Sequence, residues 1–211
     1  LYNQKVRIWR LDIYNTIYKQ NLMKKILIIG ANGFTGRQIL NDLSVHAQYK
    51  VTGCSLHPDI LPNDAGKYRF IETDIRNEAN IKRLFEEVQP DVVINCSALS
   101  VPDYCETHHE EAYLTNVTAV SQLAVFCEEY KSRFIHLSTD FVFDGKMFVF
   151  DEKINENAGL LYTEEDIPAP VNYYGYTKWK GEEKVAETCS SFAIVRVAIV
   201  YGRALPGQHG N

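Results

Sequence analysis

The sequence predicts an α/β fold built on a doubly wound parallel sheet, with helices covering both faces. Segments typical of strands alternate with segments typical of helices from residue 25 onward. Most strand segments are almost continuously apolar, as strands buried on both faces are. No internal repeat or low-complexity segment interrupts the alternation, so one parallel sheet is the simplest arrangement.

The first half of the chain contains three expected strands and two expected helices. "KILIIG" is a short apolar run that ends in glycine, which is typical of a buried strand. "NEANIKRLFEEVQ" is amphipathic and is followed at once by Pro90, which favours a helix end there. We expect strands at residues 25–30, 49–55 and 68–74, and helices at residues 36–47 and 77–89.

The second half continues the pattern around one irregular stretch. Strands are expected at residues 91–98, 133–140 and 192–202, and helices at residues 106–130 and 171–188. Residues 144–171 are long for a loop in a compact domain, and such loops are usually functional or mobile. The role of the central part, residues 146–160, stays open.

Composition excludes several classes of protein. The chain has 211 residues, 45% of them hydrophobic and 23% charged, which is typical of a globular domain. The net charge of −5 argues against a nucleic-acid partner. No run of about 18 apolar residues is present, so we expect no membrane span. The five cysteines are scattered without a CxxC pair, which favours reduced thiols and a cytoplasmic location.

The first 22 residues differ from the rest of the chain. Residues 1–22 are polar and aromatic without a clear period, and they lack the apolar core of a signal peptide. Met23 followed by "KKILIIG" is typical of a protein start. We therefore interpret residues 1–22 as an N-terminal extension of unclear origin and residues 23–203 as one domain.

A glycine motif lies between the first expected strand and the first expected helix. In "GANGFTG", three glycines have the spacing GxxGxxG. Such glycines keep the turn tight and let a pyrophosphate approach main-chain N–H groups, while the helix N-terminus adds partial positive charge. A plain glycine-rich turn looks the same, but the order strand, motif, helix favours a Rossmann-like NAD(P) site. The expected contacts are Gly30, Asn32, Gly33, Phe34, Thr35 and Gly36.

The end of the second strand usually decides between NAD and NADP. An acidic residue there binds the ribose hydroxyls, and an arginine there favours the additional phosphate. The segment "CSLHPD" places neither at the tip of the strand, and Ser55 and His57 can accommodate either cofactor. NADH and NADPH therefore both stay open.

A hydroxyl, a tyrosine and a lysine follow one another in an order that suits carbonyl reduction. Thr139 ends an expected strand, and a Tyr-x-x-x-Lys helix follows the irregular stretch. A tyrosine can give its proton to an oxygen that becomes an alcohol if a nearby cation stabilises the phenolate. The spacing occurs twice, as Tyr174 to Lys178 and as Tyr176 to Lys180, and helical geometry alone ranks neither pair first.

These segments together resemble the dTDP-4-dehydrorhamnose reductase family, within the extended short-chain dehydrogenase/reductase superfamily. The matching segments span residues 25–202. They are "GANGFTG", "PDVVINCSA", "LTNVTAV", "STDFVFDG", "YTEEDIPAPVNYYGYTKWKGE" and "RVAIVYG". The family pattern YGxTKxxGE aligns with the chain in one register, which selects Tyr174 and Lys178.

The resemblance implies catalytic and substrate roles for four residues. Thr139 would supply the hydroxyl, and Tyr174 would be the acid. Lys178 would tune Tyr174 and hold the cofactor ribose. Asp140, together with Thr139, would help to hold the sugar substrate.

Five further residues receive cofactor or structural roles from the resemblance. Asp74 would bind the adenine amino group and Ile75 would pack on the ring, although an acidic residue there also suits a helix N-terminus. Ala98 and Leu99 would lie along the cofactor. Asn116 would be the structural asparagine of the superfamily.

The resemblance implies a reductase that uses NADH or NADPH on the 4-keto group of a dTDP-linked 6-deoxyhexose, giving dTDP-L-rhamnose. The expected partner is the dTDP-sugar, and a homodimer is one assembly to consider. Two alternatives stay open: an epimerase or dehydratase with tightly bound NAD, and a non-catalytic regulatory subunit on the same fold. Residues 204–211 would begin a C-terminal substrate domain that is truncated in this chain.

The chain also departs from the family pattern, and it contains residues that suggest other chemistry. The departures are Cys96, Ser97 and Leu99, and a longer segment after Gly145. His108 and His109 lie among acidic residues, but adjacent residues point to different helix faces, so we expect no metal site. Ser138 lacks the G-x-S-x-G elbow of a hydrolase. His136 lies in an apolar strand and is interpreted as a core histidine.

Overall fold

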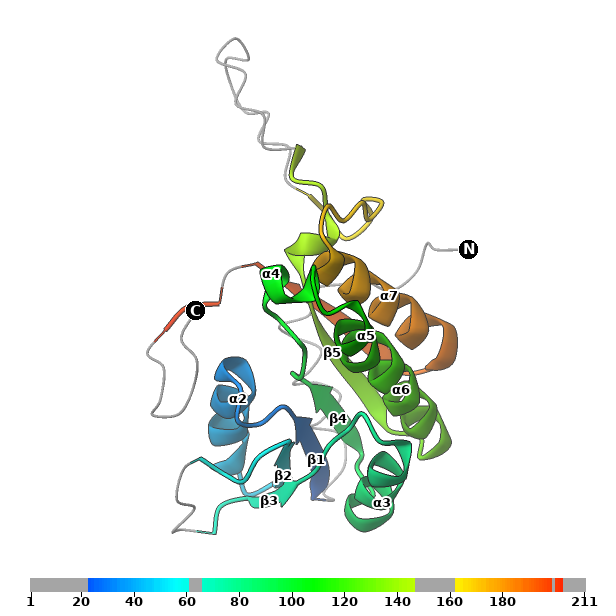
Figure 1. Cartoon of the computed structure of the whole chain (residues 1–211). Coiled ribbons are helices and arrows are strands. Elements are labelled where there is room, and N and C mark those ends of the chain that lie inside the picture. Colours follow the sequence, from blue (N-terminus) through cyan, green and yellow to red (C-terminus); the bar gives the residue numbers. More distant parts are fainter. Residues whose placement is uncertain (1–22, 61–65, 147–161, 199, 203–211) are drawn as a thin grey trace, which may run out of the picture.

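Six strands form one parallel sheet in the computed structural model, which describes residues 23–60, 66–146, 162–198 and 200–202. The strand order is β3-β2-β1-β4-β5-β6 (Figure 1). The strands are β1 (Lys24–Ile29), β2 (Tyr49–Ser55), β3 (Arg69–Glu72), β4 (Val92–Asn95), β5 (Arg133–Thr139) and β6 (Phe192–Val197). All neighbouring pairs run parallel, so the predicted Rossmann-like fold is confirmed. The order reverses between β1 and β4, and sheets of this kind bind ligands beyond the carboxyl ends of the strands at that point.

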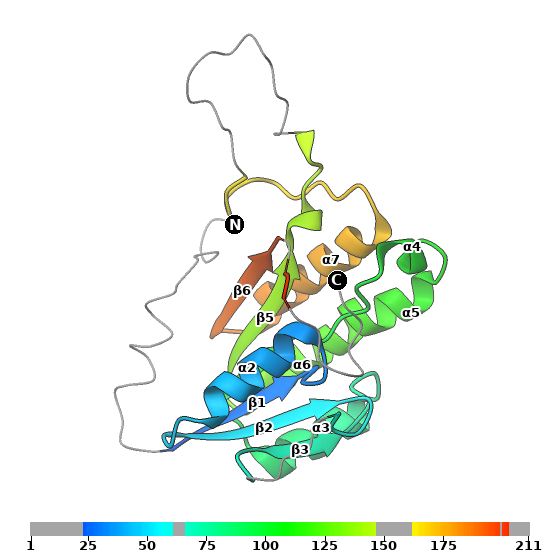
Figure 2. The ribbon, with the colours of Figure 1, turned by 90° about the vertical axis from the view of Figure 1, so that its left-hand side faces the viewer.

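Helices cover both faces of the sheet. They are α2 (Phe34–Ser44), α3 (Glu78–Val88), α4 (Pro102–Cys105), α5 (His109–Tyr113), the π-helical η1 (Leu114–Thr118), α6 (Ala119–Glu129), the 3-10 turn η2 (Asp140–Val142) and α7 (Tyr173–Thr188). Figure 2 shows α2 on one side of the sheet and α3, α6 and α7 on the other. Figure 1 shows α5 and α6 as one continuous run beside α7, and α6 packs against α7.

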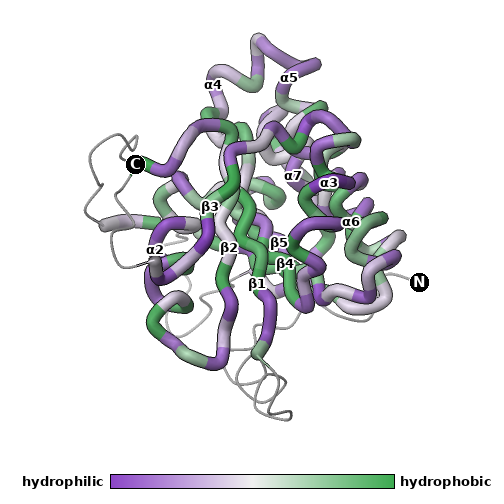
Figure 3. Tube along the Cα trace, turned by 90° about the horizontal axis from the view of Figure 1, so that it is seen from below, coloured by the Kyte–Doolittle hydropathy of each residue, from purple (hydrophilic) through white to green (hydrophobic). Residues whose placement is uncertain are grey.

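The core has two halves because β1 alternates its side chains between the faces. Ile26 and Ile28 pack with Leu40 of α2, and Leu27 and Ile29 pack with the residues under α3 and α6. All four β1 residues are at most 2% exposed. Figure 3 shows the hydrophobic colour concentrated along β1 in the middle of the molecule. A strand buried on both faces therefore explains the continuous apolar run in the sequence.

The expected helix at residues 106–130 is wrong in its first part. Pro102 begins the short helix α4, and the N–H groups of Thr107 and His108 both bond to the Tyr104 carbonyl, which closes a turn. The helix begins again at His109 and continues through η1 to the end of α6. Periodicity could not show this break because turn hydrogen bonds, and not apolar spacing, produce it.

Three strands are shorter than predicted, and the first of them, β3, covers only Arg69–Glu72 of the expected residues 68–74. The sheet pairing of β4 ends at Asn95 because its side-chain oxygen accepts the Ser97 N–H, which turns the chain out of the sheet. β6 ends at Val197 and does not continue to residue 202. The expected extension at residues 1–22, the central part of the irregular stretch and the expected second domain at residues 204–211 lie outside the described residues. In the described part of the chain, no helix has the length and apolar character needed to cross a membrane.

Candidate functional site

The turn after β1 requires glycine at two of its three motif positions, Gly30 and Gly36, and leaves little room for a side chain at Gly33. Gly30 has φ +77°, and a Cβ there would lie 2.7 Å from the Ser97 nitrogen. A Cβ on Gly36 would lie 2.3 Å from the Gly30 carbonyl oxygen, and one on Gly33 would lie 3.1 Å from it. Gly33 is the N-cap of α2 and supplies no capping side chain. The first turn of α2 thus combines a tight backbone with helix N–H groups that no side chain caps, which suits a pyrophosphate.

The other expected residues of this turn lie beside the glycines. The Asn32 side chain donates to the carbonyls of His57 and Pro58, at 3.1 and 2.8 Å, and so ties the segment after β2 to the turn. Phe34 is half-buried beside the end of the described chain, since a Cβ on Gly202 would lie 2.8 Å from its ring. Thr35 is half-buried in the first turn of α2.

Arg37 is a residue of this region that the sequence reasoning missed. It is fully buried, and its guanidinium donates to Asp59 at 2.6 Å, to the Asn32 side chain at 2.8 Å and to the Tyr68 hydroxyl at 2.9 Å. At the tip of β2, where the sequence predicts the choice between NAD and NADP, Ser55 is half-buried and His57 is exposed. The sequence signal that could have found Arg37 is its position directly after the third glycine of the GxxGxxG motif. The bond from Arg37 to Asp59 ties the segment after β2 to helix α2.

Asp74 and Ile75 follow β3, where the sequence predicts the adenine site. Both carboxylate oxygens of Asp74 accept hydrogen bonds from the Arg76 guanidinium, and these bonds lower the pKa of Asp74. Ile75 is 8% exposed and belongs to the core under α3. A hollow of about 510 Å³ lies beside Asp74, Thr73 and Leu56. The adenine role of Asp74 and Ile75 stays a prediction.

Asn116 fastens the segment after β4 to two helices. Its side-chain oxygen accepts the Leu99 N–H at 2.8 Å, and its side-chain nitrogen donates to the Leu99 carbonyl and to the Thr177 hydroxyl, both at 3.0 Å. Asn116 is fully buried within η1. Its side-chain bonds therefore hold Ala98 and Leu99, both half-buried, at the carboxyl edge of the sheet.

Thr139, Tyr174 and Lys178 meet at the carboxyl end of β5. The Thr139 hydroxyl accepts the Phe141 N–H at 3.2 Å and donates to the exposed Asp140 carboxylate at 3.1 Å. Burial raises the pKa of Tyr174, and a hydrogen bond with Thr139 opposes that rise. Lys178 is 2% exposed and its Nζ donates to the Leu137 carbonyl at 2.7 Å. Burial lowers the pKa of Lys178 to about 8.

The second Tyr-x-x-x-Lys pair lies on the outer side of α7. Tyr176 is 36% exposed, and Lys180 forms a 2.7 Å ion pair with Glu183 on the same helix. The inner side is set by two glycines. A Cβ on Gly175 would lie 2.1 Å from the Phe141 carbonyl oxygen, and one on Gly181 would lie 2.5 Å from the Asn116 carbonyl oxygen. The structure therefore brings Thr139 together with Tyr174 and Lys178 and leaves the other pair apart.

A family model describing the RmlD substrate binding domain matches residues 23–210 of this chain. The chain belongs to the RmlD substrate binding domain family. The family resemblance predicted from the sequence is therefore confirmed.

The curated relatives of this RmlD-family chain include a probable reductase and a subunit of a methionine adenosyltransferase. The chain is 33% identical over 184 residues to a probable low-salt glycan biosynthesis reductase of Haloferax volcanii, a match covering 83% of this chain and 53% of that protein. It is 32% identical over 179 residues to the methionine adenosyltransferase 2 subunit beta of Xenopus laevis, covering 85% and 48%. The chain spans about half the length of these curated relatives.

A solved structure supports the same family. The crystal structure of dTDP-4-dehydrorhamnose reductase from Bacillus anthracis in complex with NADP superposes with a TM-score of 0.69 at 26% identity. The match covers 91% of this chain and 57% of that one. This chain therefore shares its fold with a reductase that was solved with NADP.

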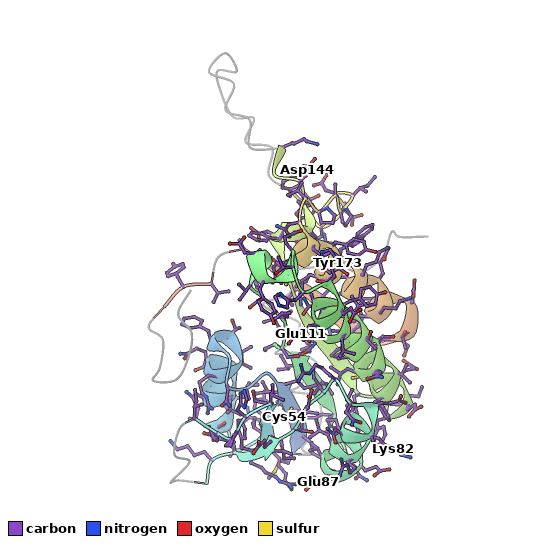
Figure 4. All side chains as sticks on the ribbon, in the orientation of Figure 1. Cys54, Lys82, Glu87, Glu111, Asp144 and Tyr173 are labelled. Carbon is purple, nitrogen blue, oxygen red and sulfur yellow. The ribbon has the colours of Figure 1, made fainter. Side chains whose placement is uncertain are left out.

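In this RmlD-family chain, Tyr162 of the irregular stretch at residues 144–171 contacts the residues where that stretch begins. The Tyr162 hydroxyl donates to the Asp144 carboxylate at 2.6 Å, and the Tyr162 ring stacks on Phe143 at 4.3 Å. The hydrogen bonds that Asp144 accepts from Tyr162 and from Lys146 lower the pKa of Asp144 to about 2. The two described ends of the insertion thus meet at Asp144, which Figure 4 labels beyond the carboxyl edge of the sheet.

The two adjacent histidines of the chain are engaged by tyrosines. His108 stacks on Tyr104 with ring centres 3.7 Å apart, and His109 stacks on Tyr173 with ring centres 3.8 Å apart. Figure 4 labels Tyr173 at the beginning of α7. Within the described ranges, His, Cys, Asp and Glu side chains form no group of three that could hold a metal ion.

Proposed function

We propose that this protein is a reductase that uses NADH or NADPH to reduce the 4-keto group of a dTDP-linked 6-deoxyhexose, giving dTDP-L-rhamnose. The observation that carries the proposal is the meeting of Thr139, Tyr174 and Lys178 at the carboxyl end of β5. Cys96, which follows β4, lies near enough to Lys178 that the charge of the lysine opposes the burial that raises the pKa of the Cys96 thiol, and its main chain borders Gly30. The three side chains therefore lie near the glycine turn expected to hold the cofactor.

The residues at this edge fit a nicotinamide dinucleotide. The glycine turn and the N-terminus of α2 would hold the pyrophosphate through main-chain N–H groups. Lys178 would hold the ribose of the nicotinamide half, and Ala98 and Leu99 would line its path. Asp74 would bind the adenine amino group while still paired with Arg76. When bound, the reduced cofactor supplies the hydride.

Each catalytic side chain has a proton role that agrees with its surroundings. Tyr174 is protonated at neutral pH, as a proton donor to the substrate oxygen must be, but its raised pKa makes it a weak acid that needs a neighbouring cation. Thr139 would bond to the same oxygen and orient it. Lys178, with a pKa of about 8, is mostly cationic at pH 7 and would stabilise the phenolate that Tyr174 leaves behind.

A matched pair of tyrosine variants tests the proposal. Tyr174→Phe removes the proton donor, and we expect turnover of a dTDP-4-keto-6-deoxyhexose to fall about 10²–10⁴-fold. Tyr176→Phe removes a hydroxyl from the exposed side of the same helix and should change turnover less than about twofold. Consumption of NADH and of NADPH is followed by absorbance. Unchanged turnover in Tyr174→Phe contradicts the proposal.

A second candidate is a subunit of another enzyme. The name of the Xenopus laevis relative, at 32% identity, favours it. A subunit needs no proton donor, so this candidate predicts no turnover with the keto-sugar and no effect of Tyr174→Phe on assembly with its partner. The epimerase alternative predicts that NAD stays bound through purification, since such an enzyme regenerates its cofactor in place.

A further inference from the structure

His136 has polar partners on both ring nitrogens, although its strand is apolar. The residue lies in β5 and is fully buried. Its Nδ1 lies 3.1 Å from the side-chain nitrogen of Asn95 in β4. Its Nε2 lies 3.4 Å from Nζ of Lys178 in α7. The imidazole therefore connects two strands of the sheet to the lysine of the proposed catalytic set.

The position of the imidazole proton follows from Asn95. The Ser97 main-chain N–H, which can only donate, bonds to Asn95 Oδ1 at 3.0 Å, and the Ser97 hydroxyl donates to the same oxygen at 2.7 Å. The amide nitrogen of Asn95 therefore faces His136 and donates to Nδ1. Nδ1 accepts and carries no proton. A neutral imidazole then carries its proton on Nε2, which faces Lys178.

The ring stays neutral in this setting. Burial, and then the charge of Lys178, lower the pKa of His136 well below its ordinary value. The Nε2–H group thus points its hydrogen toward Lys178 Nζ at all ordinary pH values. An ammonium has no lone pair to accept that hydrogen, whereas a neutral amine has one. The contact therefore favours the neutral form of Lys178.

Few other titratable groups of the described chain face Lys178. Cys96 approaches from the segment after β4, and Glu182 lies one turn further along α7; both raise the pKa of Lys178, against the larger effect of burial. The Glu182 carboxylate forms an ion pair with Arg196 of β6, which donates two hydrogen bonds to it at 2.7 and 3.0 Å. Tyr174 lies one turn earlier. Nζ of Lys178 donates to the Leu137 carbonyl at 2.7 Å and lies 3.4 Å from Nε2 of His136.

We propose that His136 is a positioning residue that fixes the Lys178 amine in place and eases the loss of its proton. This inference rests on the proposed reductase. Tyr174 gives its proton to the substrate oxygen, and a proton from the Lys178 ammonium replaces it. The amine that results accepts the Nε2–H of His136, and a proton from water restores the ammonium. Asn95 acts through His136, because it keeps the proton on Nε2.

The tautomer is tested first, by ¹⁵N NMR of the imidazole in the 211-residue chain without ligand. The two ring nitrogens differ strongly in shift when one is protonated and the other is not. We expect the proton on Nε2 of His136 across neutral pH. A proton on Nδ1, or a ring that becomes cationic near pH 6.5, overturns the proposal.

The titration of Lys178 is tested next, by NMR of ¹³C-labelled lysine side chains assigned with Lys178→Arg. His136→Phe removes the donor, and we expect the midpoint to rise by about one pH unit, or tenfold in proton affinity, the effect of one hydrogen bond. His136→Gln retains an N–H donor. We expect the Lys178 midpoint in this variant to fall between those of the unchanged chain and of His136→Phe. Asn95→Leu removes the donor that keeps the His136 proton on Nε2, so this variant should also raise the midpoint of the Lys178 titration.

His46→Phe is the matched control, because His46 is exposed and its ring meets Tyr49 edge-on, away from β5. The midpoint of the Lys178 titration in His46→Phe should equal that in the unchanged chain. Unchanged or lowered midpoints in both His136→Phe and Asn95→Leu overturn the inference. These readouts need no substrate, so they are distinguishable from failure of the proposed function, which appears only as absent turnover of the keto-sugar.

Discussion

Lys178 shows at the scale of one residue how the proposed catalytic site opposes stability. Its side chain is 2% exposed, and burial lowers its pKa from 10.5 to about 8. By linkage, keeping this cation in the folded protein at neutral pH costs about 3 kcal/mol. The hydrogen bond from Nζ to the Leu137 carbonyl offsets part of that cost. A residue kept for packing alone would not be a lysine.

Lys178→Met should therefore stabilise the protein at pH 7, by about 2 kcal/mol, because the methionine fills a similar volume without a charge. Below pH 8 the penalty on Lys178 is fully present, and it fades as pH rises from about 8 to 10.5, where the unfolded lysine also becomes neutral. The advantage of the variant should thus shrink over this window. Urea unfolding at pH 7 and pH 10 measures it.

Lys180→Met is the control for this comparison. Lys180 lies on the outer side of α7, with 29% of its side chain exposed and an ion pair to Glu183. We expect its free energy of unfolding to change by less than about 0.5–1 kcal/mol at either pH. A Lys178→Met variant that is less stable than the unchanged chain at pH 7 contradicts the burial argument.

At the scale of the element, α7 shows what sequence can predict. The spacing of Tyr-x-x-x-Lys left two registers, and the flanking glycines of the family pattern selected one of them. The structure supplies a physical reason for those glycines, since Gly175 and Gly181 lie against carbonyl oxygens of Phe141 and Asn116. Helix α7 thus approaches η2 and η1 more closely than a helix with side chains at those positions could. That contact is what turns one face of α7 inward.

Gly181→Ala should separate α7 from η1. Alanine favours a helix by about 1 kcal/mol over glycine, so propensity alone predicts a more stable protein. The added Cβ would lie 2.5 Å from the main-chain oxygen of Asn116, which cannot rotate away. We expect a net loss of about 1–3 kcal/mol in the free energy of unfolding, measured with urea. Ala186→Gly, at an exposed position of α7, measures how much the difference in helix propensity between alanine and glycine contributes in this helix. A stabilised Gly181→Ala variant contradicts the close packing.

Other features of the site depend on contacts between distant segments, and sequence reasoning could not reach them. Arg37 lies 22 residues before Asp59, and only the folded turn brings them together. His136 looked like a core residue because its neighbours in the strand are apolar, while its partners come from β4 and α7. The break before α5 comes from turn hydrogen bonds to Tyr104. Local pattern carries none of this information.

At the scale of the whole molecule, the sheet order places the candidate site. The order reverses between β1 and β4, and the carboxyl ends of β1, β4 and β5 gather at one edge. Alternation of strands and helices predicted this arrangement, because parallel strands with helical crossovers leave few topologies. The glycine turn, Asn95 and Thr139 then fall at the same edge without any assumption about catalysis. The fold was therefore more predictable than the side-chain contacts that surround the site.

A cofactor that binds this edge should stabilise the whole chain. A ligand at 100 times its dissociation constant adds about 2.7 kcal/mol if it binds only the folded state, roughly 5–10 °C in Tm for a domain of this size. We expect NADH or NADPH to raise Tm by this amount, measured by scanning calorimetry, and the cofactor with the larger shift at equal concentration is the preferred one. Lys178→Met removes the expected ribose contact and should show less than about half the shift, whereas Lys180→Met should keep it. The absence of a shift with either cofactor contradicts a nicotinamide site at the edge formed by β1, β4 and β5.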